Sequence, residues 1–386
     1  MKKNPAAAVI LTTALLLVVP SFMRGQSADL TKTENTIKGL FKKKKPAKTD
    51  TTAAAATTGA GGTAAAPLTL STYSNYDFVP GEQVIFEDHF TDDQDGEFPA
   101  HWRLNSGQGV INKVGQDPAF FLTEGNYVRV APRMKTEKNY LPENFTVEFD
   151  FYVASGGYNP LLLFTTTKNE SRNIGFGRNV STSYFPKDFS AGYPGDGSDA
   201  HYANRWHHAA MIKKGNQLKC YEDQYRVLII PDCDDCSMSF VEVGGIGGLD
   251  NPLIFRNFRI AAGGNMNLIG QKFTDAKIIT HGINFDVDKA TIRPEGMGTL
   301  NMIANVLRTN PDLKFEVDGH TDNTGAPAHN MTLSEQRADA IKTQLVAMGI
   351  DAGRLTIKGW GDTKPISDNS TQEGKANNRR VEFVKM

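Results

Sequence analysis

The spacing of apolar residues changes along this 386-residue chain, and the changes divide it into segments. Between residues 75 and 264, apolar and polar positions alternate in short runs, as at Val147, Phe149, Phe151 and Val153. Alternation is the period of a strand that buries one face, and clusters of Gly, Pro, Asn and Asp separate the runs. This segment is therefore predicted to fold as an all-β sandwich or barrel.

The C-terminal segment, residues 279–386, instead alternates strand and helix patterns. Strands are predicted at residues 277–285, 314–320, 354–359 and 380–384. One helix begins at Pro294, and a second is capped by Ser334 and ends at Gly349, each with an apolar face at helical spacing. The alternation predicts an α/β sandwich with parallel βαβ pairing, so the chain as a whole is predicted to be multidomain.

The first 74 residues show neither period. Residues 1–26 have the pattern of a secretory signal peptide, with Lys2 and Lys3 before an apolar run shorter than the roughly 20 residues that span a bilayer. Residues 27–74 are rich in Lys, Thr, Ala and Gly and are expected to form a disordered tether. A second linker is expected at residues 265–278, and the mature protein is expected to be exported.

Composition and cysteine count limit the chemistry. A net charge of -1 offers no field for nucleic acid. In an oxidising compartment, Cys220, Cys233 and Cys236 are expected to give one disulfide and one thiol, with Cys220 bound to either of the others. The C-x-x-C pair is alternatively a redox pair or half of a zinc site, but no second pair or nearby His completes one, so neither metal nor cofactor is expected. The run Asp92–Asp95 is interpreted as an Asp-rich turn, with calcium binding left open.

Three stretches of the β-rich segment resemble the concanavalin A/laminin-G-like jelly roll: FEDHFTDDQDGEFPAHW (86–102), YLPENFTVEFDFYV (140–153) and NRWHHAAMI (204–212). The resemblance implies a β-sandwich over residues 75–264. Many proteins of this fold hydrolyse glycans with an E-x-D-x-x-E strand, in which two carboxylates do the chemistry. Here Glu148 and Asp150 begin the motif, but Val153 stands in place of its last Glu. Hydrolysis is therefore not expected, and both carboxylates are interpreted as the solvent-facing half of the strand.

Two further motifs receive structural interpretations. His207 and His208 are adjacent on a predicted strand, so their side chains are expected on opposite faces. The run GGIGG at residues 244–248 lacks the third spaced Gly of a dinucleotide fingerprint. It is interpreted as a turn before the strand at Leu253.

The candidate site lies in GHTDNTGAPAHNMTLSEQRADAI, residues 319–341. Asp322 closes a predicted strand, and Arg337 lies in the first turn of the second predicted helix. A carboxylate and a guanidinium that face one pocket suit a zwitterionic ligand. Backbone amides at the start of the helix capped by Ser334 would favour the carboxylate of that ligand. The alternative is an Asp–Arg ion pair that only closes the loop between strand and helix.

The segment Ile279–Met386 resembles the C-terminal domain of OmpA-like proteins. The resemblance is carried by INFDVDKATIRPEG, FEVDGHTDNTG, NMTLSEQRADAI, GIDAGRLTIKGWGDTKPI and NNRRVEF, in the family's order and spacing. It implies non-covalent binding of peptidoglycan, whose meso-diaminopimelate carries an ammonium and a carboxylate at one end, with Asp322 and Arg337 as anchors. It further assigns four residues to the pocket: Asn330, Thr324, Asp288 and Arg380.

The resemblance leaves two positions open and implies a function. Many relatives carry Asn or Ser at the position of Asp288, and Arg379 is the alternative to Arg380. The expected function is a non-enzymatic envelope protein of a Gram-negative bacterium, periplasmic and associated with peptidoglycan and the outer membrane. Its β-sandwich would present a second surface to a glycan or an envelope protein. The alternatives are a wall-anchored glycoside hydrolase and an outer-membrane β-barrel with a periplasmic OmpA-like domain, although Lys168–Ser183 is polar for membrane strands.

Overall fold

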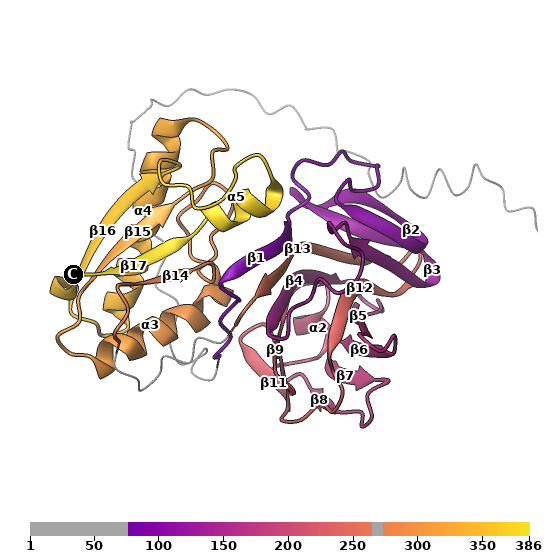
Figure 1. Cartoon of the computed structure of the whole chain (residues 1–386). Coiled ribbons are helices and arrows are strands. Elements are labelled where there is room, and N and C mark those ends of the chain that lie inside the picture. The colour runs from indigo at the N-terminus through magenta and orange to yellow at the C-terminus, as the bar shows by residue number, and fades with distance from the viewer. Residues whose placement is uncertain (1–75, 265–272) are drawn as a thin grey trace, which may run out of the picture. The chain divides into compact units, whose positions relative to one another are not determined.

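The computed structural model describes residues 76–264 and 273–386 (Figure 1). The predicted signal peptide, the predicted tether up to residue 74, and residues 265–272 of the predicted linker lie outside the described residues. Among the described helices, none combines the length and the apolar surface needed to cross a membrane.

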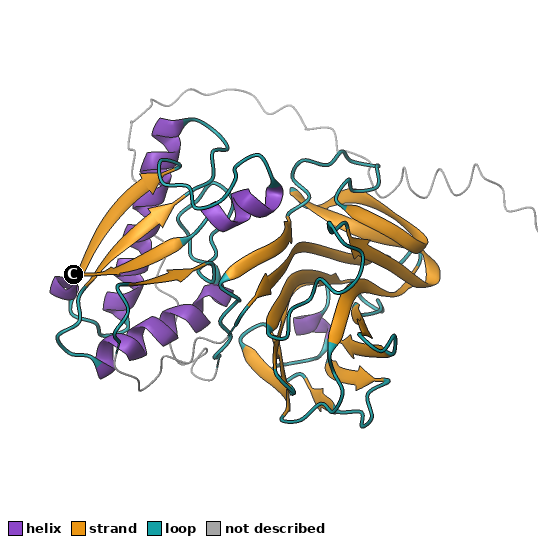
Figure 2. Cartoon of the chain, in the orientation of Figure 1, coloured by secondary structure: helices purple, strands orange, loops and turns teal. Residues whose placement is uncertain are grey.

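Strands dominate the described residues before the second gap (Figure 2). They are β1 (Gln83–Asp88), β2 (Trp102–Val114), β3 (Asp117–Pro132), β4 (Phe145–Val153), β5 (Leu161–Thr166), β6 (Ser171–Gly175), β7 (Asn179–Ser183), β8 (Ser190–Gly192), β9 (Arg205–Lys214), β10 (Gln217–Glu222), β11 (Tyr225–Ile230), β12 (Met238–Gly247) and β13 (Leu253–Ala262). The described sheet runs β11-β10-β9-β4-β13-β3-β12-β5-β6-β7-β8, with β1 paired to β13 and β2 to β3. A short helix, α2 (Asp199–Tyr202), precedes β9. The β-rich prediction is confirmed, whereas the jelly-roll topology stays a prediction.

Alternation along β4 explains the core of this sheet. Val147, Phe149 and Phe151 point the same way and are fully buried. Aromatic rings from other strands meet edge to face in the same core, since the centroid of Trp102 lies 5.1 Å from that of Phe258. These apolar contacts are the ones that the sequence pattern predicts.

The interpretation of Glu148 and Asp150 as solvent-facing is wrong. Their exposed fractions are only 3% and 2%. Arg259 of β13 lies 3.2 Å from Glu148, and Arg293 lies 2.7 Å from Asp150. The polar face of β4 is therefore covered, and its carboxylates are stabilised by ion pairs instead of by water.

The interpretation of GGIGG as a turn is also wrong. Gly244, Gly245 and Gly247 lie within β12 and pair with β3. A Cβ atom on Gly244 would lie 2.2 Å from the carbonyl oxygen of Val128, so this close approach of strands requires glycine. The turn follows directly, where Gly248 and Asn251 form an isolated bridge.

A mixed four-stranded sheet and its helices form the C-terminal domain (Figure 2). The elements are β14 (Lys277–Thr280), η2 (Pro294–Gly296), α3 (Met297–Thr309), β15 (Phe315–His320), α4 (Pro327–Ala347), η3 (Ala352–Arg354), β16 (Leu355–Gly361), α5 (Gln372–Asn378) and β17 (Val381–Lys385). The strand order is β14-β17-β15-β16. Among the described strands of this sheet, only β15 and β16 pair in parallel, around α4, because β17 lies between β14 and β15 and is antiparallel to both. The predicted strand–helix alternation is confirmed, and the sheet is mixed.

The apolar helix faces of this domain form its core as predicted. Leu300 and Ile303 of α3, and Ala338 and Ile341 of α4, are fully buried. They belong to one cluster with Phe315 of β15. Helical spacing therefore identified the buried side of both helices correctly.

The predicted start of the second helix is wrong. Helix α4 begins at Pro327, since proline suits the first helical position, where its missing N–H costs nothing. Ser334 is buried inside the helix, where its Oγ donates to Met331 O at 2.8 Å and accepts the Gly361 N–H at 2.9 Å. Arg337 consequently projects from the middle of α4, and no helix N-terminus lies at Ser334.

Candidate functional site

Asp322 occupies the loop between β15 and α4. One carboxylate oxygen accepts the Thr324 N–H at 2.8 Å, and the other accepts an N–H of Arg379. Burial alone would raise the pKa of Asp322, but the Arg379 guanidinium and the Thr324 amide lower it below its ordinary value. Asp322 is therefore a carboxylate ion with a fixed orientation at neutral pH.

Arg379 bridges Asp322 to a second carboxylate. Its Nη1 donates to Asp322, and its Nη2 donates to Glu87 of β1. The side chain of Glu87 is 2% exposed, that of Asp322 is 10% exposed and that of Arg379 is 31% exposed. Burial alone would raise the pKa of Glu87, but the Arg259 and Arg379 guanidiniums hold it well below its usual range. Glu87 was not among the predicted site residues, because it lies 292 positions from Arg379 and no local pattern links the two.

Arg337 carries its positive charge without a carboxylate partner. Its guanidinium lies over the Phe285 ring, 4.9 Å from the centroid, and its Nε donates to Lys289 O at 3.0 Å. Within residues 76–264 and 273–386, no carboxylate lies at ion-pairing distance from it. Burial and the positive charge of Arg379 lower the pKa of Arg337 to about 10, while Asp288 and Asp322 act in the opposite direction. Arg337 thus remains a cation at neutral pH.

The structure brings Asn330 and Thr324 to the Asp322 loop. Asn330 is buried, and its Nδ2 donates to Asp322 O at 3.3 Å. Thr324 is exposed and contributes its backbone N–H. Asp288 lies farther out, where its exposed carboxylate is 2.5 Å from His329 Nε2. The first two residues therefore shape the loop, whereas Asp288 influences Arg337 through space.

Arg380 does not contact Asp322. Its Nε lies 2.7 Å from Glu382, and its Nη2 donates to Lys364 O at 3.0 Å. Arg379 and Arg380 follow the end of α5, and their side chains reach different partners. The structure places Arg379 at the Asp322 loop and Arg380 in a buried polar cluster.

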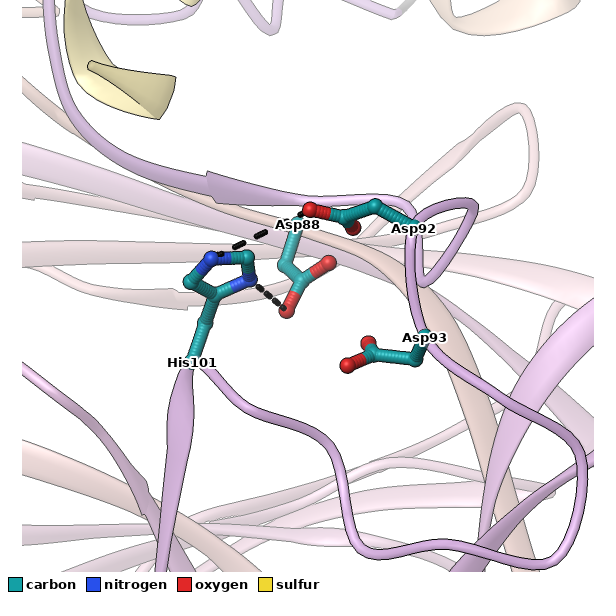
Figure 3. Close-up of side chains that lie close together, drawn as sticks. All are labelled: Asp88, Asp92, Asp93 and His101. Carbon is teal, nitrogen blue, oxygen red and sulfur yellow. Dashed lines mark ion pairs between the residues drawn. The ribbon is translucent and has the colours of Figure 1, made fainter.

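Two groups of side chains have possible metal-ligand atoms within 4.8 Å of one another. The first consists of Asp88, Asp92, Asp93 and His101, around the predicted Asp-rich turn (Figure 3). Protein donors already engage much of it, because Asp88 accepts the Phe90 N–H at 2.8 Å and the Trp102 indole N–H at 2.9 Å. Asp93 accepts the Ala100 N–H at 2.8 Å. These contacts hold the turn, while the second carboxylate oxygen of Asp93 is buried without a hydrogen-bond partner.

The second group consists of Asp150, His208 and Glu295. Arg293 lies 2.7 Å from Asp150 and 2.7 Å from Glu295, so a guanidinium takes the place that a cation would need. His207 and His208 face opposite sides of β9, as predicted, since His207 contacts Asp223 and His208 contacts Asp150. The group is therefore an ion-pair network of the protein itself.

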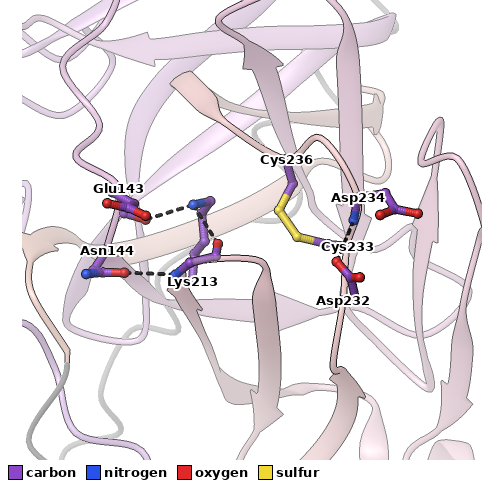
Figure 4. Close-up of a disulfide and its surroundings, with 8 residues drawn as sticks. Glu143, Asn144, Lys213, Asp232, Cys233, Asp234 and Cys236 are labelled. Atoms are coloured by element: carbon purple, nitrogen blue, oxygen red, sulfur yellow. Dashed lines mark hydrogen bonds between the residues drawn. A yellow bond between two sulfur atoms is a disulfide. The ribbon is translucent and has the colours of Figure 1, made fainter.

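The cysteines form one disulfide and leave one thiol, as predicted. The bond joins Cys233 to Cys236 within the C-x-x-C pair (Figure 4), so the expectation that Cys220 takes part in the disulfide is wrong. Cys220 is fully buried, and burial raises the pKa of its thiol to about 12. Beside this loop, Lys213 Nζ donates to the carbonyl oxygen of Glu143 at 2.7 Å. Because the Cys220 thiol is buried and its pKa is raised, it is an unreactive part of the apolar core.

Comparisons with known proteins point to the C-terminal domain. Residues 284–379 match the family model described as OmpA family. Over 104 residues the chain is 46% identical to "Probable lipoprotein YiaD" of Escherichia coli (strain K12), which covers 27% of this chain and 48% of that protein. It is 41% identical over 102 residues to "Peptidoglycan-binding protein ArfA" of Mycobacterium tuberculosis (strain H37Rv), which covers 26% of this chain and 31% of that protein. The chain therefore spans less than half the length of either relative.

Among solved structures, the peptidoglycan-associated lipoprotein from Burkholderia pseudomallei is 23% identical, with a TM-score of 0.26, over 29% of this chain and 91% of that chain. The family match coincides with the mixed sheet and helices described above. This multidomain, β-rich chain thus carries an OmpA family domain at residues 284–379.

Proposed function

We propose that the C-terminal domain binds peptidoglycan non-covalently and so anchors the protein to the cell wall. The ligand group is the free end of meso-diaminopimelate in the stem peptide. Its ammonium pairs with Asp322, and its carboxylate pairs with Arg337. A relative that is 41% identical over 102 residues is named a peptidoglycan-binding protein, which supports the choice of ligand.

The observation that carries this proposal is the guanidinium of Arg337. Its protein partners are an aromatic ring and backbone carbonyls, so an incoming carboxylate forms charge-assisted bonds without first breaking an ion pair. A structural pair between Asp322 and Arg337 is the competing explanation. Among the described residues, Asp322 forms its ion pair with Arg379 and not with Arg337, which favours a role in binding.

The other members of the site take supporting roles. We assign Arg379, and not Arg380, to the basic position beside Asp322, because Arg379 contacts that carboxylate. Asn330 and Thr324 stabilise the conformation of the Asp322 loop. Asp288 adds a negative charge that acts on Arg337. The ligand ammonium must share or replace the contact between Asp322 and Arg379.

The proposed ligand implies a location and leaves the β-sandwich a second role. Peptidoglycan binding places the protein in the cell envelope, in the periplasm beside the outer membrane. The β-sandwich presents another surface to a glycan or an envelope protein, and its described surface exposes the aromatic side chains of Tyr127, Tyr158 and Tyr184. We propose no catalytic role, since Glu148 and Asp150 are buried in ion pairs.

Substitution of either anchor tests the proposed function. Asp322→Ala and Arg337→Ala should each cost about 2–5 kcal/mol of binding, or roughly thirtyfold to several thousandfold in affinity, because each leaves one charge of the ligand unpaired. Arg337→Lys should restore binding only in part, since lysine keeps the charge and loses the planar fork. Co-sedimentation with insoluble peptidoglycan measures the effect, and circular dichroism confirms the fold.

Two controls make the result specific. Arg308→Ala removes an exposed arginine on α3 that donates to Met348 O, so binding should match the parent. Wall that contains lysine in place of diaminopimelate lacks the second carboxylate and should bind more weakly. If folded Asp322→Ala and Arg337→Ala both sediment as the parent does, the pocket assignment is wrong.

A further inference from the structure

The β-sandwich contributes a side chain to the surroundings of the proposed wall-binding site. Glu87 of β1 accepts an N–H of Arg379, whose other terminal nitrogen donates to Asp322. One oxygen of Glu87 also lies 2.5 Å from Arg259 Nη2, so its carboxylate is fixed from the sandwich side. A single guanidinium therefore joins a buried carboxylate of β1 to the carboxylate proposed to receive the ligand.

Backbone contacts fix this arrangement. The side chain of Asn377, at the end of α5, accepts the Val84 N–H at 3.0 Å and donates to Val84 O at 2.8 Å. Both hydrogen bonds are buried, and they set β1 against the end of the helix that leads into Arg379. These hydrogen bonds fix the position of β1 relative to the end of α5. Glu87 and Arg379 are therefore held close together by the backbone, and not only by their own flexible side chains.

We propose that Glu87 is a positioning residue of the wall-binding site, which holds Arg379 while a ligand ammonium replaces it on Asp322. This inference rests on the proposed function. Through Glu87, the β-sandwich sets the affinity of the C-terminal domain for peptidoglycan.

The physical reason is competition for one carboxylate. An ammonium that arrives at Asp322 must displace the Nη1 donor of Arg379. If Asp322 were its only anionic partner, Arg379 would be left as an uncompensated cation in a side chain that is only 31% exposed. Because Glu87 keeps Nη2 paired, the exchange leaves every charge with a partner. Removing the charge of Glu87 binds Arg379 more firmly to Asp322 and weakens ligand binding.

A double-mutant cycle in the full-length chain tests the proposal. Glu87→Gln should lower the affinity for insoluble meso-diaminopimelate peptidoglycan by about 5- to 150-fold, the usual range for coupled sites. In an Arg379→Gln background the same substitution should change the affinity little, because the effect passes through Arg379. A residue with only a structural role would lower the affinity equally in both backgrounds.

A second variant and a second measurement guard against misfolding. Glu87→Asp keeps the negative charge beside Arg259 but draws the carboxylate back from Arg379, so it should shift the affinity in the same direction. Carbon NMR of the Asp322 carboxyl group, without peptidoglycan, should show that Glu87→Gln lowers the pKa of Asp322 further. Glu242→Gln is the matched control, since Glu242 is a buried carboxylate that lies 3.8 Å from Arg129 on the sandwich and should leave binding at the parent level.

The outcomes separate this proposal from the proposed function. Parent-like binding by folded Asp322→Ala overturns both. Weak binding by Asp322→Ala together with parent-like or tighter binding by Glu87→Gln overturns the role of Glu87 alone. A Glu87→Gln effect that is undiminished in the Arg379→Gln background does the same. Loss of affinity that vanishes in that background supports the proposal.

Discussion

At the residue scale, the buried carboxylates of β4 show how charges from distant parts of the sequence determine the protonation state of a side chain. His208 Nδ1 lies 2.9 Å from Asp150, and its Nε2 lies 3.7 Å from Glu148. Burial alone would lower the pKa of His208, but Asp150, Glu295 and Glu148 raise it to about 9. His208 is therefore a cation in the folded protein at neutral pH, and its charge contributes to stability.

This raised pKa predicts a loss of stability at alkaline pH. Because the folded value of about 9 exceeds the ordinary 6.5, the contribution is complete below pH 6.5 and is lost as pH rises through 9. The contribution of the His208 charge to the free energy of unfolding is about 3 kcal/mol. The free energy of unfolding, measured with urea at about pH 6 and about pH 10, should decrease less between the two pH values for His208→Gln than for the parent.

Comparison with the parent is needed because another group acts in the same direction. Burial raises the pKa of Glu222 to about 8, so its contribution also falls as pH rises through that value. The exposed His329→Gln serves as control and should retain the decrease of the parent. If His208→Gln and the parent lose equal stability between the two pH values, the charge of His208 does not stabilise the fold.

The same contacts show that the burial of a charged residue cannot be predicted from the local sequence when its ion-pair partner lies far away in the chain. The pattern of β4 predicted correctly which side chains face the core, but it placed Glu148 and Asp150 in solvent. Their partners Arg259 and Arg293 come from distant segments, and no local period reveals them. The Asp322 loop was located from its own motif, whereas Glu87 lies on β1, far from that motif in the sequence.

At the element scale, glycines let α4 lie directly on its two parallel strands. A Cβ atom on Gly319 of β15 would lie 2.2 Å from Ser334 O, and one on Gly359 of β16 would lie 2.6 Å from Glu335 N. Backbone therefore packs on backbone at this contact. The Asp322 loop follows β15, and Arg337 projects from α4. The packing of α4 on β15 therefore also sets the distance between them.

Gly319→Ala should therefore damage both stability and binding. Overpacking typically costs about 1–3 kcal/mol, and here the helix must move away from the strand. Urea unfolding should show this loss, and the folded fraction should bind peptidoglycan more weakly. Gly192→Ala is the control, since nothing lies within 4 Å of the added Cβ atom. Parent-like stability of Gly319→Ala would mean that α4 shifts without cost.

Element prediction succeeded where periodicity is local and failed where a turn depends on tertiary contacts. The apolar stripes of α3 and α4 were predicted correctly from their spacing. The start of α4 was misplaced because Ser334 resembles a cap in sequence, whereas its hydroxyl bonds to Gly361 and Met331 inside the fold. Pro327 carried the correct signal for the first turn. Helix α5 was missed, since its seven residues show no apolar stripe.

At the scale of the whole molecule, the described residues form one compact unit although they contain two main apolar cores. Polar contacts join them: Asn377 pairs with the backbone of Val84, and Arg259 Nη1 donates to His281 O at 3.0 Å. Sequence periodicity, which predicts two domains here, says nothing about such contacts. The strand-rich region of residues 76–264 and the OmpA family domain are therefore expected to unfold together in the parent.

Removal of the Asn377 side chain should uncouple them. Asn377→Ala leaves the buried N–H and C=O of Val84 unsatisfied, at a cost of about 1–3 kcal/mol for each group that water does not reach. Two separate cores remain, so differential scanning calorimetry should resolve two transitions where the parent shows one. Asn305→Ala is the control, because its side-chain oxygen accepts a hydrogen bond from Arg308 on the same helix and does not contact the β-rich region within the described residues. A single transition of Asn377→Ala at the parent temperature would show that the domains are joined through other contacts, with the buried ion pairs of Glu87 and Asp150 the first to test.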